Sequence, residues 1–433
     1  MGLPEPFLTR MQAQLGEDFL AFKAAYEDAP WRGVRGNKVK LLDGSEMACL
    51  LDGAFSYIPN PHCIDGYAFR SDPKLGQTLA YLAGLFYIQE PSAMSPAVLL
   101  DAQPGERVLD LCAAPGGKTT QIAGVMQGKG LLVSNDASPT RVQALVRNIE
   151  RAGVRNAVVT TEQPHKLAAR FPAFFNRVLV DAPCSGEGMF RRDAEVIKAY
   201  TANKPEACAV IQSDILRNAA IMVKPGGRLV YSTCTFNTIE NEDVIQGILL
   251  DCPEFSLIET KRIWPHRDIG EGHFVAVLQK SDTGGEVVTR KASPAEAFPP
   301  SVTEFFNAFL KCPPLPGIPV KHGNALYLQP ESLDLKGLRT ARSGWHIGDL
   351  AKDRFIPSQA LAMALRREEA HFSVNLSEAD AWRYIKGESL DSTEAISSNK
   401  PWVLICHNNY PLGWARLVQG RLKNQLPTGW VRS

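Results

Sequence analysis

The chain has 433 residues, 45% of them hydrophobic and 21% charged, with a formal net charge of +1. This length is too great for one hydrophobic core, so two or three domains are expected, and the composition excludes a largely disordered protein. No apolar run approaches the roughly 20 residues of a membrane span, and the N-terminal residues lack the order of a secretory signal. Nine cysteines without CxxC or CxxH spacing indicate free thiols in a reducing cytoplasm rather than a metal site.

The first ninety residues predict an N-terminal α+β extension. Large apolar residues recur at three- and four-residue steps over residues 7–27, which predicts one amphipathic helix. The basic segment WRGVRGNKVKLLDG (31–44) follows, and then an aromatic, proline-rich stretch. Such a basic segment suits contact with nucleic-acid phosphates, although a solvated face would show the same charges. Its basic residues are Arg32, Arg35, Lys38 and Lys40.

From residue 105 to 279 the pattern changes to strands that alternate with helices. The expected strands span 107–112, 130–135, 157–161, 177–181, 227–232 and 273–279, and the expected helices span 117–127, 139–152 and roughly 205–223. This alternation predicts an α/β domain with a parallel, doubly wound sheet. Ligands bind such sheets outside the carboxyl ends of the strands, so the residues that end the strands are the candidates for a site.

The last third of the chain predicts a linker and further small domains. Residues 281–300 are polar and rich in glycine and proline, as in linkers. The region 301–433 ends in short apolar strands broken by Gly, Pro and Asn, which predicts a small domain followed by a β-rich module. The expected domains are therefore 1–90, 91–280 and 301–433, joined by the linker. The C-terminal segment from residue 400 has no acid and suits RNA contact through its basic residues, which are Lys400, Arg416, Arg421, Lys423 and Arg432.

The first strand of the α/β region runs into the loop AAPGGKTT (113–120) and then a helix. Glycines at such a turn let the backbone approach a ligand, and the helix N-terminus favours an anionic group. A dinucleotide site would need GxGxxG, and a P-loop would need glycine where Cys112 stands. S-adenosylmethionine is the third ligand, favoured because Asp136 ends the second strand, where a carboxylate can accept both ribose hydroxyls. Glu162, after the third strand, is a weaker candidate for the adenine edge, and Asp181 ends the fourth strand beside the expected sulfonium.

Two cysteines leave apolar strands at this same edge: Cys184 in RVLVDAPCSGEGMF and Cys234 in GGRLVYSTCT. A free cysteine is most often a small buried hydrophobe, and we interpret the other seven in this way. Two thiols at a ligand edge instead suggest covalent catalysis. A thiolate that adds to carbon 6 of a pyrimidine makes carbon 5 nucleophilic enough to take a methyl group, provided that the thiol pKa falls toward neutrality. Asp181 is expected to protonate N3 of the base, which requires a carboxyl pKa raised in a dry pocket.

With these motifs the chain resembles the NOL1/NOP2/Sun family of RNA cytosine-5 methyltransferases. The resemblance covers residues 30–280 through CAAPGGKT, DAPCSGEGMF, VKPGG and YSTCT, and through GLFYIQEPSAM before the core. It implies a Rossmann-like class I methyltransferase fold. The last segment, PLGWARLVQGRLKNQLPTGWVR, is similar to the PUA-like RNA-binding tail of a bacterial rRNA-modifying group within the family.

The resemblance implies roles that the spacing does not assign. In this family the cysteine of the STC motif is the nucleophile, here Cys234, and the cysteine of the Pro-Cys motif assists product release, here Cys184. DNA cytosine-5 methyltransferases attack with their Pro-Cys thiol instead. Asp181 would contact the cytosine, and Lys118 would line its pocket. Glu162 stands where many members have aspartate. The residues implied for the cofactor are Cys112, Ala113, Ala114, Pro115, Gly116, Gly117, Lys118, Asp136, Glu162 and Asp181.

We therefore expect an enzyme that uses S-adenosylmethionine to form 5-methylcytosine in small-subunit rRNA, either naked or within the small ribosomal subunit. A tRNA-modifying enzyme would use the same catalytic motifs. A ribosome-assembly factor that has lost catalysis would bind RNA, but it would not need the thiols and the cofactor loop. A P-loop ATPase is disfavoured by Cys112. Nothing in the sequence indicates an obligate partner chain or a membrane.

Overall fold

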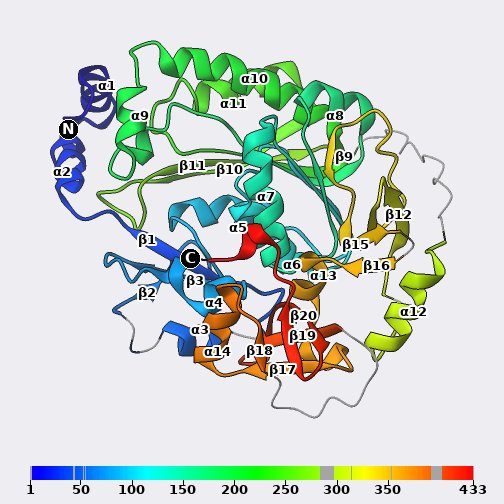
Figure 1. The fold of residues 1–433 in the computed structure, drawn as a ribbon. Coiled ribbons are helices and arrows are strands. Elements are labelled where there is room, and N and C mark those ends of the chain that lie inside the picture. Colours follow the sequence, from blue (N-terminus) through cyan, green and yellow to red (C-terminus); the bar gives the residue numbers. More distant parts are fainter. Residues whose placement is uncertain are drawn as a thin grey trace.

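The computed structural model describes residues 2–41, 44–51, 53, 55–282, 297–313, 315–352, 354–391 and 402–432. Within them the strands form four sheets: an N-terminal sheet of four strands, a central sheet of eight, and C-terminal sheets of four and five (Figure 1). The expected architecture is found: an α/β core with a mostly parallel central sheet, an N-terminal α+β extension and a β-rich C-terminal region. None of the described helices has the length and apolar character that crossing a membrane requires.

Two short helices open the chain where the sequence predicted one. Helix α1 (Glu5–Leu15) ends at Gly16, whose φ of 55° lies in the left-handed region, and α2 (Phe19–Ala24) begins after one 3-10 turn. The predicted apolar face persists across the break, because Phe7 and Phe22 pack against one another and are fully buried. The apolar helical pattern was therefore predicted correctly, but the prediction of one continuous helix was wrong.

The N-terminal sheet follows, with strand order β2-β3-β1-β4. Its strands are β1 (Arg32–Gly36), β2 (Ile58–Pro59), β3 (Gly66–Phe69) and β4 (Phe86–Ile88). Helices α3 (Gly44–Leu51) and α4 (Leu79–Leu82) lie between these strands in the chain, and α5 (Ser95–Leu100) leads into the central sheet. The basic segment predicted to face RNA therefore forms the middle of a sheet.

The central sheet has the strand order β10-β11-β9-β8-β5-β6-β7-β14. Its strands are β5 (Arg107–Asp110), β6 (Leu131–Asn135), β7 (Ala157–Thr160), β8 (Phe175–Asp181), β9 (Val223–Thr233), β10 (Phe255–Ile263), β11 (His273–Lys280) and β14 (Thr340–Arg342). The strands from β5 to β9 run parallel, whereas β10, β11 and β14 pair antiparallel to their neighbours. All six predicted strands are present. Strands β10 and β14, one at each edge, were not predicted.

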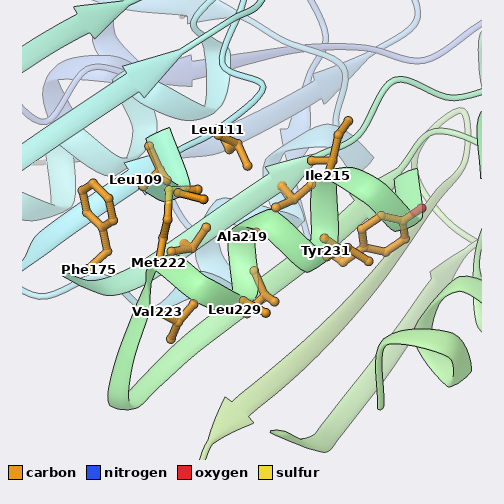
Figure 2. Close-up of a cluster of buried hydrophobic side chains, with 14 of the residues drawn as sticks. Leu109, Leu111, Phe175, Ile215, Ala219, Met222, Val223, Leu229 and Tyr231 are labelled. Carbon is orange, nitrogen blue, oxygen red and sulfur yellow. The ribbon is translucent and has the colours of Figure 1, made fainter. Parts of the chain in front are cut away.

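Helices cover both faces of the central sheet (Figure 1). They are α5, α6 (Gly117–Met126), α7 (Pro139–Arg151), α8 (Pro164–Arg170), α10 (Lys204–Met222) and α11 (Glu242–Asp251), whereas α9 (Ala194–Lys198) packs with α1 and α2. Figure 2 shows one face, where Ile215, Ala219 and Met222 of α10 point at the strands from successive turns. Burying an apolar side chain of this size stabilises the fold by roughly 1.5–3 kcal/mol. The packing of α10 supports β8 and β9, whose ends carry the two cysteine motifs.

The C-terminal region contains two further sheets, of orders β12-β13-β15-β16 and β17-β19-β20-β21-β18. The first consists of β12 (Ile318–His322), β13 (Ala325–Gln329), β15 (Trp345–Ala351) and β16 (Arg354–Pro357), with α12 (Pro300–Phe309) and α13 (Gln359–Ala364) beside it. The second consists of β17 (Ser373–Leu376), β18 (Leu390–Asp391), β19 (Trp402–His407), β20 (Tyr410–Val418) and β21 (Arg421–Asn424), with α14 (Glu378–Ile385). Most of the predicted linker, residues 283–296, lies outside the described residues.

The two ends of the chain share one hydrophobic core. Val34 and Phe86 of the N-terminal sheet belong to the same buried cluster as Val403, Ile405 and Leu422 of the five-stranded sheet. Figure 1 shows these two sheets next to one another below the central sheet. The regions that flank the α/β core in sequence therefore pack together in space.

Candidate active site

A cavity of about 650 Å³ opens at the carboxyl edge of the central sheet. It lies where strands β5, β6, β8 and β9 end, as expected for ligands of doubly wound sheets. The predicted site residues that line it are Cys112, Asp136, Asp181, Cys184 and Cys234. Residues from α9 and α10 complete the wall, among them Val196, Lys204 and Ile211.

The structure brings the two cysteines together. Their sulfurs lie 3.2 Å apart, within hydrogen-bonding distance, although the residues are fifty positions apart in the chain. Both are free thiols and form no disulfide. The parallel pairing of β8 with β9 sets this distance, because it aligns Asp181 with Ser232 just before the two loops. The hydrogen bond to Cys234, together with burial and the charge of Glu240, raises the pKa of the Cys184 thiol.

Asp181 lies beside the thiols in a strongly polar environment. Its carboxylate pairs with Lys118 Nζ at 2.7 Å and accepts a hydrogen bond from Ser232 Oγ at 2.8 Å, while His273 Nε2 lies 3.8 Å away. Burial alone would raise the pKa of Asp181, but the charge of Lys118 and the neighbouring His273 outweigh it and hold the pKa well below its ordinary value. The structure therefore does not show the raised pKa that was predicted for Asp181 and that a role as an acid would require.

The loop after β5 is held rigidly as it turns into α6. Gly116 has a φ of 110°, and a Cβ atom there would lie 3.1 Å from Leu145, so both its backbone and its surroundings favour glycine. Asn148 of α7 donates to the Pro115 carbonyl at 2.8 Å, and the Ala113 amide donates to Asn135 at 2.7 Å. Of the predicted loop residues, the cavity wall includes Cys112 and not Ala113, Ala114, Pro115, Gly116, Gly117 or Lys118.

Asp136 ends β6 and faces the cavity, but it has partners of its own. Its carboxylate pairs with Arg141 at 3.2 Å and accepts from the amides of Ser138 at 3.0 Å and Ala114 at 3.3 Å. Arg141 in turn donates to the Ala114 carbonyl. Asp136 thus fastens the cofactor loop to the next strand.

Glu162 is not at the cavity. Its buried carboxylate accepts the amide of Arg339 at 2.8 Å and pairs with the guanidinium of Arg339 at 3.3 Å and with Lys166 at 3.5 Å. Arg339 comes from the segment that leads into β14, which was not predicted to touch this sheet. Gln163 and Pro164, the next two residues, line the cavity instead. The prediction of Glu162 as a cofactor contact is therefore corrected.

The basic segment near the N-terminus is largely buried rather than RNA-facing. Arg35 is 3% exposed and donates to the Gly117 carbonyl at 2.9 Å and to Thr120 Oγ1 at 2.9 Å, at the first turn of α6. Burial lowers the pKa of Arg35 to about 10 and that of Lys40 to about 7. Arg32 is more exposed but pairs with Asp72, and Lys38 pairs with Asp65. The expected contact of Arg35 and Lys40 with phosphates is wrong, because Arg35 is buried against α6 and the Lys40 ammonium donates to the Ala83 carbonyl.

Comparison with known proteins gives four family matches along the chain. They are 16S rRNA methyltransferase RsmB/F over residues 97–279, the N-terminal domain of 16S rRNA methyltransferase RsmF over 3–91, the RsmF rRNA methyltransferase first C-terminal domain over 304–365, and the methyltransferase RsmF PUA domain over 371–432. The chain is also 32% identical to the ribosomal RNA small subunit methyltransferase F of Vibrio atlanticus, over 99% of this chain and 98% of that protein. The chain belongs to the RsmF family of 16S rRNA methyltransferases.

Other relatives agree with the RsmF assignment. The ribosomal RNA small subunit methyltransferase F of Erwinia tasmaniensis is 30% identical over 99% of this chain and 97% of its own length. A solved structure of a methyltransferase homolog protein from Pyrococcus horikoshii superposes with a TM-score of 0.58 at 30% identity, covering 64% of this chain and 96% of that one. Membership in the RsmF family makes the chain an rRNA cytosine-5 methyltransferase, and the resemblance recognised in the sequence is confirmed.

The RsmF PUA match contains an exposed basic face on β20 and β21. Arg416 and Lys423 are exposed and directly opposite one another across the two strands. Like charges at such positions repel, unless an anion lies between them. The Arg416 guanidinium also lies over the Trp402 ring, 5.6 Å from its centre. Arg421 pairs with Asp391 at 3.2 Å, and Lys400 lies outside the described residues.

Several residues near the RsmF-type site were missed by the sequence analysis. Ser232 and His273 reach Asp181 through the pairing of β9 with β8 and β11, a register that no local pattern reveals. Glu187 and Glu240 are fully buried behind the cysteine loops. Their signal was available, since Glu187 lies three residues after Cys184 and Glu240 lies six residues after Cys234.

Proposed function

We propose that this enzyme transfers a methyl group from S-adenosylmethionine to carbon 5 of a cytosine in 16S rRNA, with Cys234 as the nucleophile and Cys184 as the thiol that assists release. The observation that carries the proposal is the pair of thiols, 3.2 Å apart, in the wall of a cavity that Cys112 and Asp136, which follow β5 and β6, also line. Two thiols in contact with one cavity support addition and elimination at a single base.

The residues present fit the proposed cofactor. A cavity of about 650 Å³ is of the size that drug-sized ligands and cofactors fill. Asp136 would accept hydrogen bonds from the ribose hydroxyls, while Arg141 either moves away from Asp136 or stays bound to it. The loop 112–117 and the N-terminus of α6 would face the carboxylate of the cofactor. When bound, S-adenosylmethionine supplies the methyl group. Two neighbouring thiols that must stay unbonded also suit a reducing cytoplasm.

The remaining chemistry falls to side chains of this chain. The Cys234 thiolate adds to carbon 6 of the cytosine. Cys184 faces carbons 5 and 6 of the same base. Because Asp181 is held ionised, it serves as a hydrogen-bond acceptor for the base rather than as an acid. Lys118, 2.7 Å from Asp181, is the adjacent N–H donor and takes the place of Asp181 as the candidate proton source for N3.

We propose that residues 1–90 and 301–433, which flank the catalytic domain (91–280) in sequence and pack together in space, bind RNA. Support comes from the exposed Arg416 and Lys423 of the five-stranded sheet, since neutralised phosphates dominate affinity for RNA. The N-terminal part has fewer basic residues for RNA binding, because Arg35 and Lys40 are not exposed. Only Arg32 and Lys38 of its basic segment remain to contact RNA. The substrate is either naked 16S rRNA or the small ribosomal subunit.

Methyl transfer from labelled S-adenosylmethionine tests the proposal, with naked 16S rRNA, small ribosomal subunits and tRNA as parallel acceptors. We expect label in 5-methylcytosine of one rRNA acceptor. Label in tRNA would redirect the substrate assignment, and label in no acceptor with retained cofactor binding would indicate an assembly factor. Cys234→Ala should abolish transfer, whereas Cys184→Ala should accumulate a covalent protein–RNA adduct. Exposed Cys312→Ala is the matched control and should behave like wild type. Adduct in Cys234→Ala would reverse the two roles.

A further inference from the structure

Two buried carboxylates lie behind the cysteine loops, and they differ in how their charge is balanced. Glu187 is fully buried and pairs with Arg10 at 3.4 Å, with further donors from the amides of Phe236 and Asn237. Glu240 is equally buried, and among the described residues no cation lies within ion-pair distance of it. Glu240 is therefore a charge without a counter-charge.

Neutral donors surround the Glu240 carboxylate. It accepts from the Ser185 amide at 2.8 Å, from Gln212 Nε2 at 2.9 Å and from Asn237 Nδ2 at 2.8 Å. A carboxylate with this many donors can stay ionised when buried, although burial raises the pKa of Glu240 above its ordinary value. These dipoles hold the charge in place and do not cancel it.

The position of this charge distinguishes the two thiols. Ser185, whose amide points at Glu240, directly follows Cys184, so the carboxylate lies behind the Cys184 turn. The other carboxylate near the pair, Asp181, is offset by Lys118 at 2.7 Å. The two carboxylates near the thiols therefore differ: Asp181 has a cation partner, and Glu240, behind the Cys184 turn, has none.

We propose that Glu240 is the positioning residue that divides the labour between the thiols: its buried carboxylate keeps Cys184 protonated, so that the single negative charge of the pair resides on Cys234. The S–H of Cys184 then donates across the 3.2 Å contact to the Cys234 thiolate and stabilises it. The assignment of Cys234 as nucleophile would follow from this electrostatic asymmetry as well as from the family. It rests on the proposed function only for the roles of the thiols, since the charge distribution exists without substrate.

Other titratable groups face the pair or its cavity from every neighbouring element, and any pH dependence includes their effect. They are Lys118, Asp181, Glu195, Lys204, Cys208, Asp214, Tyr231 and His273. Cys208 hydrogen-bonds to Glu240. Burial and the charge of Glu240 raise the pKa of Cys208 to about 11, so this thiol stays neutral near pH 7. Unlike these groups, Glu240 both lies behind the Cys184 turn and has no cation within ion-pair distance among the described residues.

The test measures the reactivity of each thiol against pH in the full-length enzyme without RNA or cofactor. Initial rates of iodoacetamide alkylation at Cys184 and Cys234 are read by peptide mass mapping between pH 6 and pH 10. In wild type we expect Cys234 to reach half-maximal reactivity at a pH at least one unit below Cys184. Cys184 reacting at the lower pH would overturn the proposal without any variant.

Glu240→Gln should lower the half-maximal pH of Cys184 by about one unit, a tenfold rise in its reactivity at a fixed pH, and move Cys234 less. Glu240→Asp, which retains the charge, should restore the wild-type profile. Glu187→Gln is the matched control, because it neutralises an equally buried carboxylate whose charge Arg10 already offsets. Equal shifts in Glu240→Gln and Glu187→Gln, or no shift in either, would refute the role of Glu240. Since no methyl transfer is measured, a negative result here leaves the proposed function untouched.

Discussion

The buried ion pair between Arg191 and Glu271 fastens the N-terminal extension to the catalytic core. The Arg191 guanidinium contacts both Glu271 oxygens, at 2.7 and 3.0 Å, and the side chains are 4% and 1% exposed. The same carboxylate accepts the amide of Trp31 at 2.6 Å, immediately before β1. Arg191 also donates to the carbonyl of Ala25. One carboxylate thus collects donors from both sides of the junction.

Glu271→Gln should lower the free energy of unfolding by roughly 3–5 kcal/mol, because the amide places donors against donors and leaves Arg191 buried without a counter-charge. Urea unfolding followed by circular dichroism measures the loss, and hydrogen exchange across residues 32–36 locates it. The control is Asp251→Asn in the exposed pair with Arg217, at 43% and 55% exposure, which should cost less than about 1 kcal/mol.

The double variant Arg191→Met with Glu271→Met removes both charges at once. It should lie closer to wild type than Glu271→Gln does, because replacing a buried pair by apolar side chains avoids the uncompensated charge. A loss in Glu271→Gln no larger than in Asp251→Asn would refute the reasoning, and would mean that the other contacts of the extension hold it to the core without this ion pair.

Three further variants test other parts of the structure. Arg35→Gln should weaken binding of S-adenosylhomocysteine about tenfold in calorimetry, or about 1.4 kcal/mol, because the first turn of α6 loses its clamp; Arg32→Gln is the exposed control, and equal losses would contradict the clamp. Burial raises the pKa of Asp110 from 3.8 to about 7, so its contribution to stability is greatest below pH 4 and falls as the pH rises through 7. Asp110→Asn should therefore gain about 2 kcal/mol relative to wild type between pH 5 and pH 8 in urea unfolding, and a pH-independent difference would count against this. Arg416→Glu with Lys423→Glu should weaken 16S rRNA binding and reduce its logarithmic salt slope by about 1.5, leaving cofactor affinity unchanged; an unaltered slope would remove this face from the RNA interface.

The sequence predicted what depends on local pattern. Strands β5 to β9 are largely buried on both faces and form apolar runs in the sequence, so their existence and their parallel arrangement could be predicted, but their order in the sheet could not. Strand β10 was not predicted because it is an edge strand. Its residues from Ser256 to Thr260 are exposed, and apolar and polar residues alternate poorly along it. Strand β14 has three residues and gains its meaning only from pairing with β7, about 180 positions earlier. No local pattern contains that partner.

The same division applies to the site. Cys184 and Cys234 could be placed together because each ends a strand of the same sheet. The ionisation of Asp181 could not be predicted from its own segment, since burial and an adjacent cation act in opposite directions and the geometry decides between them. Arg35 shows the limit most clearly. A charge pattern is the same for an arginine that contacts phosphate and for one that is buried, and only the fold distinguishes them.

Both regions that flank residues 91–280 in sequence contact the structure around the loop after β5. The cofactor loop is held by Arg35 of the extension at one end, and by Asn148 of α7 at the Pro115 carbonyl. Helix α7 in turn carries Arg147, which donates to the Gly429 carbonyl and stacks over Trp430, 5.0 Å from the ring centre. Both regions proposed to bind RNA therefore touch the elements that shape the loop. A change that RNA binding causes in either region can therefore reach the cofactor loop through these contacts. Any coupling between RNA binding and cofactor binding must be reciprocal.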